Sequence, residues 1–146
     1  MNKATRKQLS ALQADLNAQN VALVNLREAL EERATDAALL TPEQLAILEN
    51  VGGVLSDVQS SVSDLCGDEE EKFDNMPEGL QSSDRGVEME AAKDALSEAS
   101  DSLEALCSTL SDDFEATTTH EEAVEALKLA EDELTEIFDK LDEAAA

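Results

Sequence analysis

Aromatic residues are scarce in this chain of 146 residues, which has no Trp, no Tyr and three Phe (Phe73, Phe114 and Phe138). A core must therefore be built from Leu, Val, Ile, Ala and Met, which suits packed helices better than a sandwich of sheets. Acidic chains with few aromatics are often disordered. Here hydrophobic residues make up 42% of the chain and recur periodically, so we expect a folded domain.

Basic residues are also few, because 10 Lys and Arg stand against 35 Asp and Glu, a formal net charge of −25. The imbalance begins after the first 33 residues, since residues 34–146 hold 31 of the acids and 5 of the bases. Such a surface repels phosphate, which disfavours direct binding to nucleic acid or to an anionic membrane. We therefore expect a basic protein as partner, for instance one that itself binds nucleic acid.

The chain lacks the residue patterns of an active site. Its single histidine, His120, has no nucleophile or orienting acid near it in sequence, so we expect it on the surface. Cys66 and Cys107 fit neither a disulfide framework nor a zinc site, and we expect free thiols at the margin of the core. No Gly-rich phosphate loop or serine elbow occurs. The sequence thus predicts no enzymatic activity, no metal and no cofactor.

Long apolar runs are missing as well. The first 16 residues contain no apolar segment of the kind found in signal peptides, and no stretch is long enough to span a bilayer. With two cysteines that form no framework, these features predict a cytoplasmic protein.

What the chain does contain is a heptad pattern of apolar residues in four segments. Spacings of three and four, sustained over several turns, are typical of a helix seam, whereas no segment shows the alternation of a strand. The seam residues are, in the first segment, Leu9, Leu12, Leu16, Leu23, Leu26 and Leu30; in the second, Leu48, Val51, Leu55, Val58, Val62 and Leu65; in the third, Met89, Ala92, Leu96, Ala99, Leu103, Leu106 and Leu110; in the fourth, Val124, Leu127, Leu134, Phe138 and Leu141.

Capping signals separate the four segments. Thr41 and Thr119 each precede a helical pattern and are followed three residues later by Gln44 and Glu122, the spacing of a capping box. Ser82, Ser83 or Asp84 can cap a helix between them. We predict an all-α fold, a single domain over residues 1–146, built as a coiled-coil-like antiparallel hairpin or four-helix bundle. The predicted helices lie near 4–34, 42–74, 84–115 and 120–144.

Gly52, Gly53 and Gly67 fall inside the second predicted helix, where each costs about 1 kcal/mol relative to alanine. Either close packing requires them or the helix bends at these points, and we expect close packing. The acids Asp68 to Glu71 with Asp74 resemble a cation cluster, but they lack the turn glycine of a calcium loop. We expect these acids on a helix surface.

The first segment carries almost no net charge, so like-charge repulsion is weakest there. We expect a homo-oligomer held together by the six leucines of residues 4–34, with Gln19 helping to set the register.

Acidic side chains crowd the outer faces of the third and fourth predicted helices. Ordinary surface helices pair acids with Lys or Arg one turn away, and here few such partners exist. Carboxylates one turn apart lie about 5–6 Å from each other, comparable to phosphates along a strand. The face is therefore either a nucleic-acid mimic or simply the solvated side of an acidic scaffold. The candidate partner-binding residues are Glu90, Asp94, Glu98, Asp101, Glu122, Glu125, Asp132 and Glu136.

The stretch from Asp68 to Gly86, centred on Phe-Asp-Asn-Met-Pro-Glu-Gly-Leu-Gln over 73–81, resembles a segment of small acidic helical proteins of bacteriophages and prophages. The resemblance covers roughly 68–106 and implies a turn between two long antiparallel helices. Phe73, Met76 and Leu80 can close the end of the core there. It further implies a phage setting, in the host cytoplasm, with a host defence or nucleic-acid-binding protein as the target of inhibition. The alternative is a structural or assembly coiled-coil protein.

Overall fold

The structure is a computed structural model that describes the backbone of residues 3–32, 40–116 and 119–146, with side chains for all of these except 111–116. Its helices are α1 (Lys3–Glu31), α2 (Pro42–Asp74), α3 (Glu78–Gln81), α4 (Asp84–Ala116) and α5 (His120–Ala145). No strand occurs in these described ranges, and the all-helical prediction is confirmed. The predicted end of the first helix, at residue 34, lies outside the described residues.

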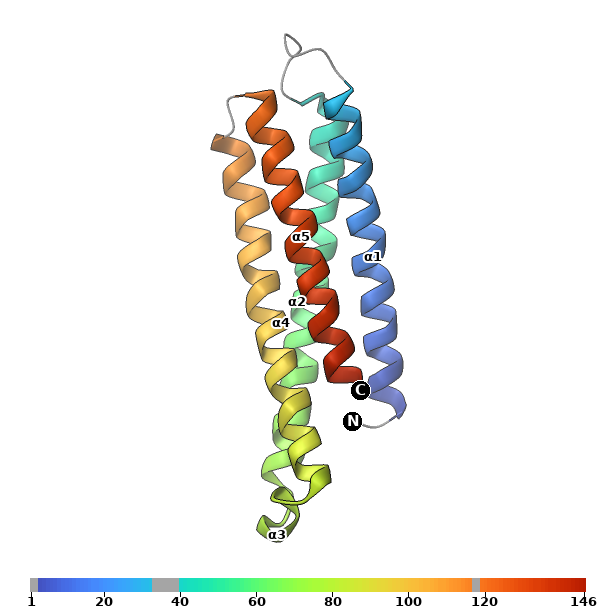
Figure 1. The fold of residues 1–146 in the computed structure, drawn as a ribbon, viewed down its shortest axis with the longest axis vertical. Coiled ribbons are helices and arrows are strands. Elements are labelled where there is room, and N and C mark those ends of the chain that lie inside the picture. Colours follow the sequence, from blue (N-terminus) through green and yellow to red (C-terminus); the bar gives the residue numbers. More distant parts are fainter. Residues whose placement is uncertain (1–2, 33–39, 117–118) are drawn as a thin grey trace.

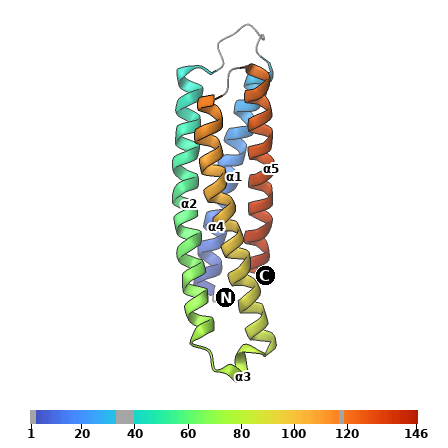
Figure 2. The same ribbon diagram turned by 90° about the vertical axis from the view of Figure 1, so that its left-hand side faces the viewer.

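The four long helices form an antiparallel bundle. α1 packs against α2 and α5, and α4 packs against the same two helices, so α1 and α4 occupy opposite corners (Figures 1 and 2). α2 and α4 extend beyond the other two helices and carry the short α3 at their joined end (Figure 1). The molecule is therefore a four-helix bundle from which one two-helix hairpin projects.

Heptad leucines and valines fill the core, as the seams of the first three segments predict. A buried side chain of this size contributes about 1.5–3 kcal/mol relative to exposure, so this layer dominates the stability of the bundle. The largest side chains that are almost fully enclosed are Leu9, Leu16, Leu23, Leu30, Leu55, Leu96, Leu103, Leu106, Leu127, Leu134, Ile137 and Leu141.

The seam of α5 differs from its prediction. Phe138 is 37% exposed and Val124 is only half-buried, whereas Ile137 is enclosed. Alanines complete the observed seam at Ala123, Ala130 and Ala144. The predicted seam is wrong at Val124 and Phe138, because each of these residues lies one position after a buried residue, Ala123 and Ile137.

The leucines expected to make a self-contact are used inside the single chain. Leu9, Leu16, Leu23 and Leu30 are at most 1% exposed, Leu26 is 3% exposed and Leu12 is half-buried. They pack in the same core cluster as the seams of α2, α4 and α5. The assignment of this seam to self-association is therefore wrong for this fold, because the other three helices already cover it.

Both predicted capping boxes are present. The Thr41 hydroxyl accepts a hydrogen bond from the amide of Gln44, whose side chain in turn accepts one from the Thr41 amide, and Pro42 opens α2. Thr119 and Glu122 make the same reciprocal pair at the start of α5. At α4 the Ser83 hydroxyl accepts from the Gly86 amide at 3.4 Å. These caps satisfy amides that the first turn of a helix leaves unpaired.

The turn at the projecting end lies where the sequence predicts it. The Gln81 side-chain amide donates to the carbonyl oxygens of Phe73 and Met76, at 3.2 and 3.0 Å. Phe73 and Met76 are partly buried, but Leu80 is 54% exposed. The expectation that Leu80 closes the core is wrong, because α3 turns this side chain away from the two helices.

α2 runs without interruption from Pro42 to Asp74. A Cβ added at Gly52, Gly53 or Gly67 would meet no atom within 4 Å, so the expected close packing at these glycines is wrong. The tight approach lies instead at Gly86, where a Cβ would come within 2.0 Å of the Gln81 carbonyl oxygen. Glycine at this position lets α4 start directly beside the end of α3.

Candidate partner-binding surface

The four candidate acids of α4 point away from the core. Glu90, Asp94, Glu98 and Asp101 are all exposed, while Leu96, Ala99 and Leu103 of the same helix are fully buried. The 3.6-residue period places them on the outer side because the buried residues occupy the opposite side.

The four candidate acids of α5 are exposed as well. Glu122, Glu125, Asp132 and Glu136 alternate with the buried positions of that helix. We refer to these eight residues of the two helices as the α4/α5 acidic face.

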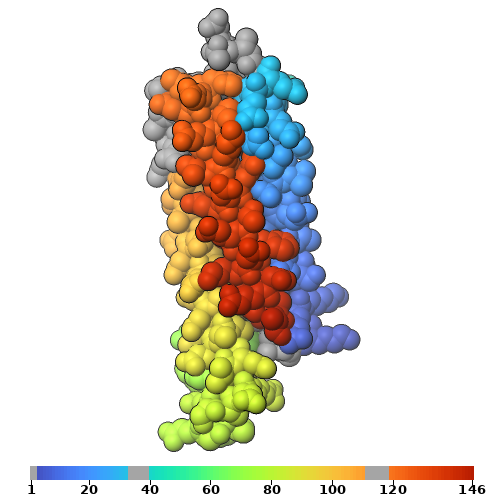
Figure 3. All heavy atoms as spheres, viewed as in Figure 1, coloured from blue at the N-terminus to red at the C-terminus, as the bar shows by residue number. Residues whose placement is uncertain are grey.

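One ion pair fixes the levels of the two sets along the bundle axis. Lys140 Nζ of α5 lies 2.5 Å from Glu98 Oε2 of α4, and the two helices pack side by side (Figures 1 and 3). Because the helices are antiparallel, Glu136 lies one turn beyond Lys140 at the level of Asp101. The α5 acids thus begin where the α4 acids end. At about 1.5 Å per residue the combined row is roughly 40 Å long.

Three of the eight acids already have partners inside the chain. Glu98 pairs with Lys140 and raises the pKa of that lysine. Asp94 lies 3.7 Å from Lys93, and Glu122 accepts the Thr119 amide in the capping box. Glu122 therefore makes the capping box that the sequence predicts, in addition to lying on this face.

The remaining five acids make no ion pair with any residue that the structure describes; they are Glu90, Asp101, Glu125, Asp132 and Glu136. Ion pairs between solvent-exposed side chains are screened by water, so Lys93 and Lys140 cancel little of the negative charge of this face. The face keeps a strong negative potential, held on helices whose opposite sides are locked in the core.

Lys93 lies between two groups at the edge of this face. Its ammonium is 5.7 Å from the centre of the Phe73 ring and 3.7 Å from Asp94. A cation over a ring is attracted by the ring quadrupole. Lys93 therefore links α4 to the end of α2 and, of the eight acids, pairs with Asp94 alone.

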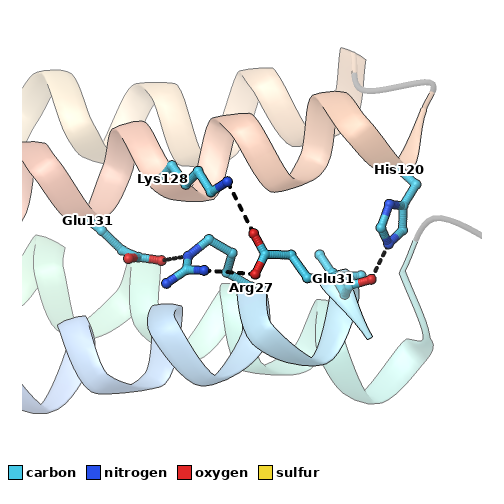
Figure 4. Close-up of polar contacts among 6 residues, drawn as sticks. Arg27, Glu31, His120, Lys128 and Glu131 are labelled. Carbon is cyan, nitrogen blue, oxygen red and sulfur yellow. Dashed lines mark hydrogen bonds and ion pairs between the residues drawn. The ribbon is translucent and has the colours of Figure 1, made fainter. Parts of the chain in front are cut away.

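A polar network that the sequence did not reveal joins α1 to α5 (Figure 4). Arg27 Nε donates to Glu131 at 2.7 Å, and its Nη1 donates to Glu31 at 3.0 Å. Lys128 lies 3.1 Å from the other oxygen of Glu31. The hydrogen bond to Glu131 raises the pKa of Arg27, and the one from Lys128 lowers the pKa of Glu31. The sequence does hint at a polar contact here, because Glu131 is an acid among the apolar positions of the fourth segment.

His120 is part of the same junction and is not the surface residue that we expected. Its ring is partly buried, and Nε2 contacts the carbonyl oxygen of Leu30 (Figure 4). Since a carbonyl only accepts, Nε2 must carry the proton. His120 thus binds a carbonyl at the C-terminal end of α1, one of the groups that a helix end leaves unpaired.

Glu69 is the one acid of the 68–74 cluster that is buried, with no exposed area, whereas Asp68, Glu70, Glu71 and Asp74 are exposed as expected. Lys72 Nζ lies 2.8 Å from its Oε1, and its Oε2 has no hydrogen-bond partner. The sequence contained the signal, because Glu69 follows the seam residue Val62 by seven positions.

Cys66 and Cys107 are free and partly buried. Burial raises the pKa of both thiols, and for Cys66 the nearby charge of Glu70 adds to the effect. Both thiols are therefore disfavoured as nucleophiles. Within the described residues, no group of three or more His, Cys, Asp or Glu side chains is placed to hold a metal ion.

Comparison of the chain with protein-family models, curated proteins and solved structures gives no match. In the part of the chain that the structure describes, no helix combines the length and apolarity needed to cross a membrane.

Proposed function

We propose that this chain is a non-catalytic binding protein whose α4/α5 acidic face occupies the nucleic-acid-binding surface of a basic partner. The observation that carries the proposal is the set of five exposed carboxylates that pair with no described residue, along about 35 Å of two packed helices. Duplex DNA carries more charge per length than this row, but carboxylates one turn apart lie about 5–6 Å from each other, comparable to neighbouring phosphates along one strand. A basic groove that binds those phosphates would therefore also attract this row.

The expected setting follows from the resemblance of residues 68–106 to small acidic phage proteins. In that setting the partner is a host nucleic-acid-binding or defence protein, and binding inhibits it in the host cytoplasm. Inhibition needs no reaction, since competition for one basic surface is sufficient.

The test uses two variants of equal charge. One carries Glu90→Gln, Asp101→Asn, Glu125→Gln and Glu136→Gln on the acidic face. The control carries Glu49→Gln, Asp57→Asn, Asp64→Asn and Asp68→Asn, which are exposed acids of α2. Each protein is immobilised, exposed to a host-cell lysate and eluted with duplex DNA. We expect the wild type and the control to release the same basic protein into the DNA eluate, and the acidic-face variant to release little of it.

Equal recovery on all three proteins would contradict the proposal, as would a bound protein that DNA fails to displace. The second candidate function, an assembly scaffold, is favoured by the projecting hairpin, whose end exposes Leu80 and Val87 at 54% and 57%. A scaffold of this kind would lose its partner on Leu80→Ser and Val87→Ser and keep it when the acidic face is neutralised.

A further inference from the structure

The solvent-facing side of α1 carries its own regular stripe. Each of Lys7, Ala14, Val21 and Glu28 precedes a buried leucine of the core by two residues, which is about 200° around the helix. With Lys3 and Glu32 at its ends the stripe is exposed along its whole length, and Val21 is 51% exposed. We refer to these six residues as the α1 outer stripe.

The charges at the two ends of this stripe oppose the helix dipole. α1 has no acid in its first turn and no base in its last turn, the reverse of what stabilises a helix. Basic Lys3 and Lys7 lie near the positive end, and acidic Glu28 and Glu32 lie near the negative end. Their placement therefore does not serve the stability of α1 itself.

These four side chains also make no ion pair with any described residue of their own chain. The two arginines of α1 are engaged within the chain. Arg6 donates to the Ala146 carbonyl oxygen, and Arg27 donates to Glu31 and Glu131 of the network. Apart from Arg27, the only charged residue between Lys7 and Glu28 is Asp15. On a chain with net charge −25, this is where like-charge repulsion between two copies is smallest.

We infer that the α1 outer stripe pairs with the same stripe of a second copy, in antiparallel orientation. A two-fold axis between Asn17 and Ala18 places Lys7 opposite Glu28 of the second copy and Lys3 opposite its Glu32. Each ion pair occurs twice by symmetry, as a self-complementary contact requires. At the centre of the stripe, the side chains of Ala14 and Val21 are small and uncharged, which allows two helices to approach closely. The inference does not depend on the proposed function.

A groove beside the stripe continues this surface. It has a volume of 570 Å³ and lies between α1 and α2, where Leu26, Ile47 and Val51 contribute to its lining. Ile47 is 43% exposed at its edge. Stable interfaces bury on the order of 1,600 Å² in total, more than one helix stripe is expected to supply. The groove extends the contact beyond α1 on the same side of the molecule.

Charge exchange tests the pairing. One variant carries Lys3→Glu and Lys7→Glu, so both ends of its stripe are acidic; the other carries Glu28→Lys and Glu32→Lys, so both ends are basic. Analytical ultracentrifugation should show that each variant alone dimerises at least about tenfold more weakly than the wild type. An equimolar mixture should restore the dimer, because unlike ends then meet. Circular dichroism should show that each variant remains helical. A monomeric wild type, or variants that dimerise alone as well as the wild type, would overturn the inference.

Cysteine cross-linking tests the orientation in a chain carrying Cys66→Ser and Cys107→Ser. Asn17→Cys lies beside the axis and should form a disulfide-linked dimer on mild oxidation. Lys3→Cys should not, because antiparallel copies separate the two positions by about 40 Å. Cross-linking at both positions would show a parallel pair, and cross-linking at neither would show that α1 is not the interface. Either result contradicts the inference.

Discussion

Cys66 Sγ donates a hydrogen bond of 3.6 Å to the carbonyl oxygen of Lys93, across the hairpin of α2 and α4. Gln59 and Ser100, bonded at 3.2 Å, share with Cys66 and Lys93 the same midpoint in the sequence, between Gly79 and Leu80. The two pairs therefore report one register, with the turn where the sequence predicts it. Cys107 follows Lys93 by 14 residues, or about 21 Å along α4, too far for a disulfide to Cys66.

Both thiols should react slowly in the folded protein. Burial raises the pKa of Cys66 and of Cys107, so the thiolate forms at a higher pH than in an unfolded chain. We expect alkylation by iodoacetamide at pH 8 to be several-fold slower than in urea, with the midpoint of the rate-against-pH curve shifted upward. Equal rates in the folded and unfolded states would show that the thiols are not protected.

The fold could be predicted because its determinants are local and repetitive. The Thr41 and Thr119 capping boxes mark helix starts within a few residues of sequence, and the heptad leucines mark the buried side. The polar junction of Arg27, His120 and Glu131 could not be predicted, since it joins residues about 100 positions apart whose meeting depends on which helices are neighbours. Periodicity likewise does not determine whether a leucine seam packs within its own chain or against a second copy, so the expectation of self-association through the α1 leucines had no local signal to correct it.

Alanine at the α2 glycines should stabilise the protein. Gly52, Gly53 and Gly67 have open space around an added Cβ, so each Gly→Ala substitution gains about 0.5–1 kcal/mol of helix propensity. Gly86→Ala is the matched contrast, because its Cβ would collide with backbone and should cost about 1–3 kcal/mol. Urea unfolding followed by circular dichroism measures both changes. A neutral Gly86→Ala would show that the start of α4 is looser than the structure indicates.

Aspartate should have very unequal effects on the two sides of α1. Leu16 is 1% exposed, so Leu16→Asp buries an unpaired charge and should cost more than about 4 kcal/mol, a large part of the stability of a domain. Val21→Asp lies on the outer stripe, so it should weaken self-association but change the stability of the dilute, monomeric chain by about 0.5 kcal/mol or less. Thermal unfolding compares the two. A folded Leu16→Asp monomer would restore the original assignment of the seam to self-association.

The junction of α1 and α5 should weaken in acid. The hydrogen bond from Lys128 and the charge of Arg27 lower the pKa of Glu31 in the folded state. Glu31 therefore adds stability above its unfolded pKa, near 4.5, and this contribution is lost as pH falls through the lower folded value. Glu31→Gln should destabilise the protein at pH 7 and flatten the loss of stability that begins near pH 5 and continues as the pH falls through the folded pKa of Glu31. An unchanged pH profile would mean that Glu31 contributes nothing to the junction.

The salt dependence of partner binding tests the acidic face most directly. With the basic protein recovered from the lysate, the dissociation constant is measured across a series of salt concentrations for the wild type, the acidic-face variant and the α2 control. Mimicry predicts a steep rise of the dissociation constant with salt for the wild type and the control. For the variant with Glu90, Asp101, Glu125 and Glu136 neutralised, it predicts binding at least about tenfold weaker at low salt and a flatter slope. The same affinity and the same slope for all three proteins would contradict the account.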